Sequence, residues 1–127
     1  AAELEPRPWA PAQIPRVAWT RPALAQVGET PERLAGREVQ FHTLRLEETT
    51  FGLLRGVGEK DDAKGLVRLA SDSDSGRLLG ATALGPAAPE IASAVALALR
   101  LGATEGQLAE VFAAVPGGLD APFRATR

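Results

Sequence analysis

The sequence has 127 residues, 45% of them hydrophobic, which is the size and composition of one domain with its own core. Its 14 basic and 16 acidic residues give a net charge of −2 and argue against nucleic acid or an anionic membrane as a partner. The sequence contains no cysteine, which excludes disulfides, thiolate nucleophiles, zinc ribbons and iron–sulfur clusters and is consistent with a cytoplasmic protein.

Residues 1–13 are rich in proline and predict an extended linker ahead of the domain, because proline removes backbone donors from helices and sheets. Nothing in this stretch looks like a signal peptide. Ala1 is not an initiator methionine, so we expect a processed chain or a fragment of a longer protein.

The segments that follow the linker predict a sheet with short connections. A short helix is expected after Thr30, with Pro31 at its first position and Gly36 at its end. Strands are expected at Val17–Thr20, Arg37–Leu46, Phe51–Val57, Lys64–Ala70 and Arg77–Leu84. Within the second of these strands the apolar positions change parity after Thr43, which predicts a β-bulge or a strong twist near Leu44 and Leu46. Consecutive strands with short links predict an antiparallel sheet of three to five strands.

Helices are predicted in the last third of the sequence. Pro89 opens an apolar segment that Gly102 ends, as proline and glycine often do at the two ends of a helix. Thr104 and Gln107 form a capping box, in which side chain and backbone satisfy each other's donors. Behind the box, apolar residues recur at helical spacing from Leu108 to Val115, which predicts a second helix.

Strands followed by helices indicate an α+β fold. We expect the domain to span residues 14–116 and to end in a tail at residues 117–127.

Short motifs that resemble ligand sites lack the spacing that such sites require. The stretch Asp72–Gly76 has no glycine at position six of a calcium loop and no glutamate at position twelve. The pair Gly56 and Gly58 lacks the third glycine of a dinucleotide fingerprint and a surrounding strand–turn–helix unit. Both stretches are therefore interpreted as turns.

Titratable side chains give no better candidate. Glu47 and Glu48 are neighbours on a predicted strand and should point to opposite faces. His42, the only histidine, is expected to face solvent without a metal or a catalytic partner. We therefore predict no catalytic residue, no cofactor-binding residue and no metal ligand in this chain.

The predicted helix after Pro89 is apolar around most of its circumference, whereas a helix on the surface of a sheet needs an apolar face of little over 100°. It must be covered by its own sheet and by a second layer, and in a chain this small we expect that layer to be another subunit. Burial under the predicted helix of residues 107–115 is the alternative. The stretch from Ile91 to Leu101 is too short to span a bilayer. The predicted interface residues are Ile91, Ala94, Val95, Ala98 and Leu99.

Six short motifs follow one another with natural spacing along the chain. They are I-P-x-V with T-x-P at Ile14–Pro22, V-G at Val27–Gly28, G-x-V-x-L at Gly65–Leu69, R-L-L-G at Arg77–Gly80, G-P-x-A-x-E-I at Gly85–Ile91 and L-G-A-T at Leu101–Thr104. In this order they resemble the C-terminal dimerisation domain of the pyridine nucleotide–disulfide oxidoreductases, a family that includes dihydrolipoamide dehydrogenase, glutathione reductase and mercuric reductase. The resemblance covers about residues 14 to 116 and implies an α+β unit that pairs with its twin in a homodimer.

The resemblance also implies that FAD and NAD(P) bind to upstream domains of a parent protein, which would carry the redox cysteine pair. We therefore expect this chain alone to bind no cofactor and to transfer no electrons. Members that reduce disulfides carry a catalytic His-Pro-x-x-x-Glu dyad directly after the last apolar helix. In this sequence Val115 stands at the position of the histidine and Asp120 at that of the glutamate. Because valine has no transferable proton, the catalytic role is not carried over.

A second hypothesis is a free-standing interaction or scaffold module that kept this fold without an enzyme. An open reading frame upstream with a Gly-rich fingerprint and a cysteine pair would favour the parent enzyme over the module.

Overall fold

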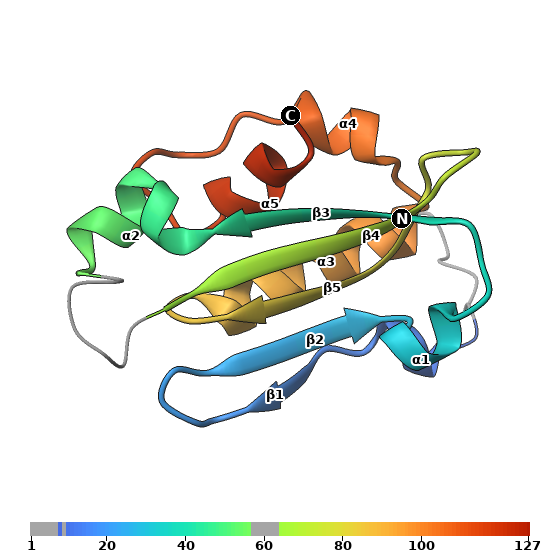
Figure 1. Ribbon diagram of the computed structural model, residues 1–127, viewed down its shortest axis with the longest axis horizontal. Helices are drawn as coiled ribbons and strands as arrows, with labels where there is room; N and C mark the ends of the chain where they lie inside the picture. The colour runs from blue at the N-terminus through green and yellow to red at the C-terminus, as the bar shows by residue number, and fades with distance from the viewer. Residues whose placement is uncertain (1–7, 9, 57–63) are drawn as a thin grey trace, which may run out of the picture.

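A computed structural model describes residues 8, 10–56 and 64–127 of the chain (Figure 1). Five strands form one antiparallel sheet in the order β1-β2-β5-β4-β3. They are β1 (Arg16–Ala18), β2 (Leu24–Gly28), β3 (Val39–Arg45), β4 (Leu66–Asp72) and β5 (Leu78–Leu84). Together with the helices below, they confirm the α+β fold and the antiparallel sheet expected from the sequence.

The helices pack mainly on one face of this sheet. The α-helices are α1 (Pro31–Leu34), α2 (Thr50–Leu54), α3 (Ala88–Leu101), α4 (Glu105–Ala109) and α5 (Asp120–Ala125), and the 3-10 turns are η1 (Pro11–Gln13) and η2 (Leu46–Glu48). Helix α3 packs on β2 and β5 and helix α5 packs on β3 and β4, and both lie behind the sheet in Figure 1. Among the described residues, no comparable helix layer covers the opposite face of the sheet.

The core lies between the sheet and α3. Inward side chains of the strands pack against the buried face of α3 in one hydrophobic cluster, and Ala121 of α5 belongs to the same cluster. Small residues dominate the central strands, so the helix approaches the sheet closely and little aromatic surface is needed. The strand residues of this core are Ala25, Val27, Val67, Leu69, Leu78, Ala81 and Ala83.

Helix α3 begins and ends much as the sequence predicts. Pro89 lies in its first turn, and Gly102 ends it in the left-handed conformation with a φ of +67°. Ala87, the residue before the helix, also has a positive φ of 65°, which is uncommon for a residue with a side chain.

The strand expected at Phe51–Val57 is wrong, because this segment forms helix α2; Val57 itself lies outside the described residues. The Thr49 hydroxyl caps the helix by accepting a hydrogen bond of 2.9 Å from the backbone N–H of Gly52. A Cβ at Gly52 would come within 1.8 Å of the Leu46 carbonyl oxygen, so only glycine allows this close contact.

Inward and outward side chains alternate along β3, but the residues that point inward are the ones that were expected to point outward. His42 and Leu44 point inward ahead of the fully buried Leu46, whereas Phe41 points to solvent. The pairing of β3 with β4 is regular from Val39 to Arg45, so no bulge lies there, and the strong twist that was the other expectation stays a prediction. The irregularity lies instead in the pairing of β4 with β5, between Ala70 and Ser71.

The C-terminal region also differs from the prediction. The capping box of Thr104 and Gln107 is present, but helix α4 ends at Ala109 instead of continuing to Val115. Residues 117–127, expected to be a tail, contain helix α5, whose Ala121 is buried in the core.

Candidate functional site

Helix α3 has two different faces. The side chains of Ile91, Val95 and Leu99 are buried against the chain's own sheet. They therefore expose little surface to a partner in the single chain, and the expectation that they form the interface stays a prediction. Ala94 and Ala98 are only half-buried, and their place in an interface stays a prediction.

The outer face of α3 carries an exposed leucine among small residues. Leu97 is 62% exposed, and Leu101, one helical turn later, is also exposed. At helical spacing the neighbours of Leu97 are Ser93, Ala94, Arg100 and Leu101, and Ala96 and Ala98 lie further round the helix on either side. The two exposed leucines project from a mixed surface of alanine, serine and arginine side chains, and an exposed leucine of this kind can fit between the side chains of a packed helix.

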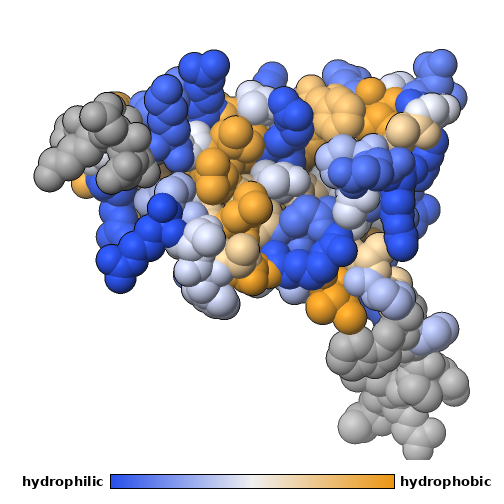
Figure 2. Space-filling model, turned by 60° about the horizontal axis from the view of Figure 1, so that its bottom comes forward, coloured by the Kyte–Doolittle hydropathy of each residue, from blue (hydrophilic) through white to orange (hydrophobic). Residues whose placement is uncertain are grey.

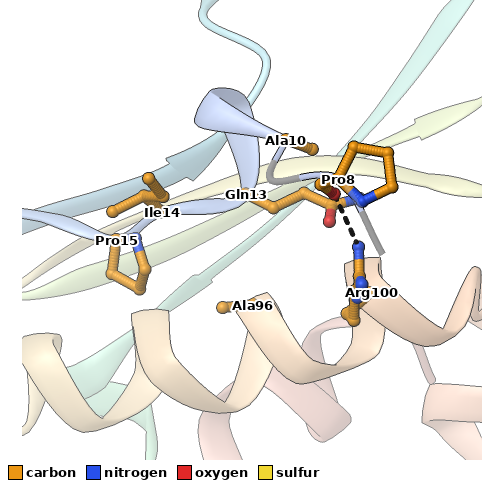
Figure 3. Close-up of a pocket in the computed structure, with 7 residues that line it drawn as sticks. All are labelled: Pro8, Ala10, Gln13, Ile14, Pro15, Ala96 and Arg100. Atoms are coloured by element: carbon orange, nitrogen blue, oxygen red, sulfur yellow. Dashed lines mark hydrogen bonds between the residues drawn. The ribbon is translucent and has the colours of Figure 1, made fainter. Parts of the chain in front are cut away.

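A groove of about 400 Å³ runs beside this face, between α3 and the segment that leads into β1 (Figure 3). Ala96 and Arg100 form its helical side, one residue before and three residues after Leu97. The Arg100 guanidinium donates a hydrogen bond of 3.5 Å to the Pro8 carbonyl, and Gln13 Nε2 donates one of 3.4 Å to the Leu99 carbonyl. The opposite wall consists of Pro8, Ala10, Gln13, Ile14 and Pro15.

These contacts hold η1 against the end of α3, so part of the segment expected to be a linker packs on the domain. Figure 2 shows hydrophobic residues in separate patches between hydrophilic ones, with no single broad apolar face in that view. A partner would therefore meet a small apolar patch surrounded by polar residues.

The segment after α4 is where the catalytic dyad of the disulfide reductases would lie. Val115 is 61% exposed and has no titratable group. Asp120 is 8% exposed at the start of α5, where its Oδ2 lies 3.7 Å from Arg124 Nη1. Valine can neither accept nor donate a proton, so these two positions form no acid/base pair, and the absence of catalytic chemistry here stays a prediction.

The same segment is held by the last residue of the sequence. Arg127 donates hydrogen bonds to the carbonyls of Ala109, at 3.0 Å, and of Val111, at 2.8 Å. Its guanidinium lies 5.5 Å from the centre of the Phe112 ring, although Phe112 is 92% exposed. These contacts occupy carbonyls that a longer helix α4 would have used.

A polar cluster that the sequence did not reveal joins three elements. His42 Nε2 of β3 lies 2.7 Å from Glu105 Oε2 in the first turn of α4. The fully buried Ser71 hydroxyl of β4 donates a hydrogen bond to the same oxygen. The hydrogen bond from Ser71, and then the one from His42, lowers the pKa of the Glu105 carboxyl. His42 is thus half-buried with a partner, which corrects the expectation that it faces solvent.

The remaining titratable residues show no ligand geometry. Glu48 is exposed, whereas Glu47 is half-buried with one carboxylate oxygen enclosed and without a hydrogen-bond partner. In the part of the chain that the structure describes, His, Asp and Glu side chains form no group of three or more that could hold a metal ion. Within residues 8, 10–56 and 64–127, no helix has the length and hydropathy of a transmembrane span.

A five-stranded antiparallel sheet with its main helices, α3 and α5, on one face defines an α+β domain. The family model of the pyridine nucleotide–disulphide oxidoreductase dimerisation domain matches residues 14–122. The chain belongs to this family and is its dimerisation domain.

Curated relatives agree with this assignment. The chain is 36% identical over 101 residues to a mercuric reductase from Streptomyces lividans, covering 78% of the chain and 20% of that protein. It is 32% identical over 103 residues to the mitochondrial dihydrolipoyl dehydrogenase of Mus musculus, covering 81% of the chain and 20% of that enzyme. The chain thus spans about a fifth of the length of these relatives.

Solved structures show the same fold. LpdA from Mycobacterium tuberculosis superposes with a TM-score of 0.83 at 20% identity, covering 94% of this chain and 26% of that chain. The HOCl-induced flavoprotein disulfide reductase RclA from Escherichia coli superposes with a TM-score of 0.78 at 21% identity, covering 89% and 25% of the two chains.

Proposed function

We propose that two copies of this chain pair through the outer face of helix α3. The observation that carries the proposal is the exposed Leu97, which projects from the outer face of α3 beside a mostly apolar groove. In a two-fold interface the same patch supplies both halves of each contact, so a knob next to a hollow is complementary to itself. The two α3 helices would cross, and Leu97 of each would fill the groove of the other.

Small residues decide how close the helices come. Ala94 and Ala98 lie on one side of Leu97 and Ala96 on the other, so a second helix could approach closely there, and it would pack around Ser93, Arg100 and Leu101. Ile91, Val95 and Leu99 contribute to the proposed interface indirectly. Their burial holds α3 on the sheet and so determines the direction in which Leu97 points.

Sedimentation of the chain at tens of micromolar tests this pairing. We expect a dimer for the natural sequence and a folded monomer for Leu97→Glu, since two carboxylates would be forced together in an apolar contact. Leu53→Glu is the matched control, because Leu53 on α2 is 64% exposed and lies away from the proposed interface. A monomeric natural chain, or a Leu97→Glu dimer, would contradict the proposal; circular dichroism verifies that each variant is folded.

We further propose that the chain serves as the interface domain of a longer flavin-dependent oxidoreductase. Support comes from the family assignment and from the length of the relatives, of which the chain spans a fifth. FAD and NAD(P) would then bind to other parts of the parent. Titration calorimetry of the 127-residue chain with FAD and NADH should show no binding, whereas the purified full-length product should carry flavin absorbance near 450 nm.

The proposed parent differs from the disulfide reductases at the acid/base position. Because Val115 cannot move a proton, we infer that the parent uses an electron acceptor that needs no histidine from this segment. Val115→His in the chain should give no dithiol–disulfide activity, since no cysteine is present. An active variant would overturn this inference.

A further inference from the structure

We propose that the open face of the sheet, opposite α3, is a docking surface for a separate protein that presents apolar side chains beside carboxylates. The register of the five strands places the outward residues in rows that cross the sheet. Neither α3 nor α5 lies on this face, as Figure 1 shows.

The first row is apolar and ends in a cation. Leu24 pairs with Leu84, and Leu84 pairs with Leu66, so three leucines lie side by side on neighbouring strands. Ala18 of β1 continues this leucine row at one end and Arg45 of β3 at the other. At a strand spacing of about 4.8 Å the five residues span roughly 19 Å.

A leucine row is unusual on a sheet face open to solvent, where polar residues normally alternate with the buried ones. Leu24 is exposed and Leu66 and Leu84 are half-buried. A hollow of about 230 Å³, lined by Arg45, Glu47, Lys64, Gly65, Leu66 and Leu84, adjoins the β3 end of the row and could take an apolar side chain.

The second row, two residues further along the strands, is polar and basic. Arg16 pairs with Gln26, and across β5 the row continues through Thr82 to Arg68 and Thr43. This arginine row lies roughly 7 Å from the leucine row.

Neighbouring side chains orient the two arginines of this row. Arg16 donates to the Gln26 side chain, and Arg68 Nε donates to Thr43 Oγ1 at 3.1 Å. The Arg68 guanidinium also lies 5.7 Å from the centre of the Phe41 ring. Both arginines are thus held on the sheet with hydrogen-bond donors left for a partner.

Charge decides the kind of partner. The two rows contain Arg16, Arg45 and Arg68 and no carboxylate, although the chain as a whole has a net charge of −2. Among the described residues, carboxylates at the border of the face are Glu47, at the end of the leucine row, and Glu29, which lies 3.8 Å from Arg33. A positive field beside an apolar row selects a surface with carboxylates beside apolar side chains.

Nucleic acid fits this face less well. Single strands bind to sheets through several stacked aromatic side chains in a strongly basic groove. In the two rows no side chain is aromatic; Phe41 lies beside them on the next row, and three leucines occupy the centre. We therefore commit to a protein partner.

A helical 16-residue peptide of leucine, alanine and glutamate, with glutamates beside a leucine stripe, is a direct probe for this surface. The 127-residue chain should bind it with an affinity that falls steeply as sodium chloride is raised. Substituting all three arginines, Arg16→Gln with Arg45→Gln and Arg68→Gln, should weaken binding about tenfold or more. Leu24→Ser should weaken it as well, because the leucine row loses an apolar contact.

The matched control is Arg124→Gln, which removes an arginine from α5 on the other side of the sheet and should leave the affinity unchanged. A peptide with glutamine in place of glutamate should not bind. Equal binding of the two peptides, no binding at all, or an unchanged affinity of the triple variant would overturn the proposal. Tighter binding of oligo(dT) through the same arginines would overturn it in favour of nucleic acid.

This surface does not depend on the pairing of two chains. Leu97→Glu, which tests the pairing, leaves the open sheet face unchanged and should bind the peptide as the natural chain does. Failure of one proposal is thus distinguishable from failure of the other.

Discussion

Helices α3 and α4 are fixed to the same sheet by different means. Helix α3 has fourteen residues, and it is held by the burial of Ile91, Val95 and Leu99 in the core. Helix α4 has five residues and buries one leucine, Leu108. It is held mainly by hydrogen bonds of its first turn.

Those hydrogen bonds are numerous for so short a helix. Thr104 and Gln107 form the capping box, and the backbone N–H of Glu105 donates to the Gly76 carbonyl at 2.8 Å. The Glu105 side chain accepts from Ser71 and His42. The stabilisation from apolar burial grows with the buried area and therefore with helix length, so a small change of one side chain removes only part of it. A helix held by hydrogen bonds depends on a few polar atoms, so the loss of one of them has a larger relative effect. The two helices should therefore respond differently to substitution and to pH.

The largest effect is expected where α3 is buried. Ile91→Ala leaves a cavity in the core between helix and sheet, and it should lower the free energy of unfolding by about 3 kcal/mol. Urea unfolding followed by circular dichroism measures this loss. A loss below about 1 kcal/mol would mean that the core can close around the cavity and that burial does not hold α3.

The next effect concerns Glu105. Glu105→Gln should lower the free energy of unfolding by roughly 1–2 kcal/mol, because Ser71 and His42 lose their charged acceptor. The fold lowers the pKa of this carboxyl from its ordinary value of 4.5, so the ionised form stabilises the native state. That contribution is complete above pH 4.5 and is lost as the pH falls through the lowered pKa.

The pH dependence of the free energy of unfolding shows whether the Glu105 side chain stabilises the fold through its charge or only through its shape. Below pH 4.5 the natural chain should lose stability more steeply than Glu105→Gln, and the two curves should converge at low pH. Chemical unfolding between pH 3 and pH 7 gives both curves. Parallel curves would show that the carboxylate does not contribute through its charge.

A smaller effect is expected at the cap of α4. Thr104→Ala removes the acceptor for the Gln107 backbone N–H, a bond of 3.2 Å, and should cost about 1 kcal/mol. Thr104→Ser is the matched control and should cost less, since it keeps the hydroxyl. Hydrogen exchange of the Gln107 amide reports the local change.

The smallest effect is expected where the longer helix was predicted. Phe112→Ala should change the free energy of unfolding by less than about 0.5 kcal/mol, because the ring is almost fully exposed and contacts Arg127 only from one side. A loss comparable to that of Ile91→Ala would show that the segment after α4 packs more firmly than the structure indicates.

Much of the fold could be predicted from the sequence because its signals are local. The proline before α3 and the glycine after it, the capping box of α4 and the polar turn between β4 and β5 each depend on a few neighbouring residues. The fold class and the family resemblance follow from the order of these segments.

The rest depended on contacts between residues distant in sequence. Nothing near Leu108 shows that Arg127 occupies the carbonyls that a longer α4 would need. The phase of β3 is set by the burial of Leu46, and the position of Ser71 inside the sheet by an irregular pairing with β5. The cluster of His42, Ser71 and Glu105 brings together residues up to 63 positions apart, and no motif connects them.

The proposed interface was predicted only in outline. Hydropathy shows that α3 is apolar on most sides, but it does not show which side faces the sheet. The packing of α3 resolves this, because β2 and β5 cover the face of Ile91 and Val95 and leave Leu97 outside.

The arginines of the open sheet face have a consequence for how copies of this domain meet one another. If two sheets were brought face to face, Arg16, Arg45 and Arg68 of each copy would confront the same three cations of the other, with no carboxylate in the rows to neutralise them. Leucines alone would favour such stacking. The cations would oppose it, which is consistent with the proposed pairing through the outer face of α3 and with the proposed use of the sheet face by a different molecule.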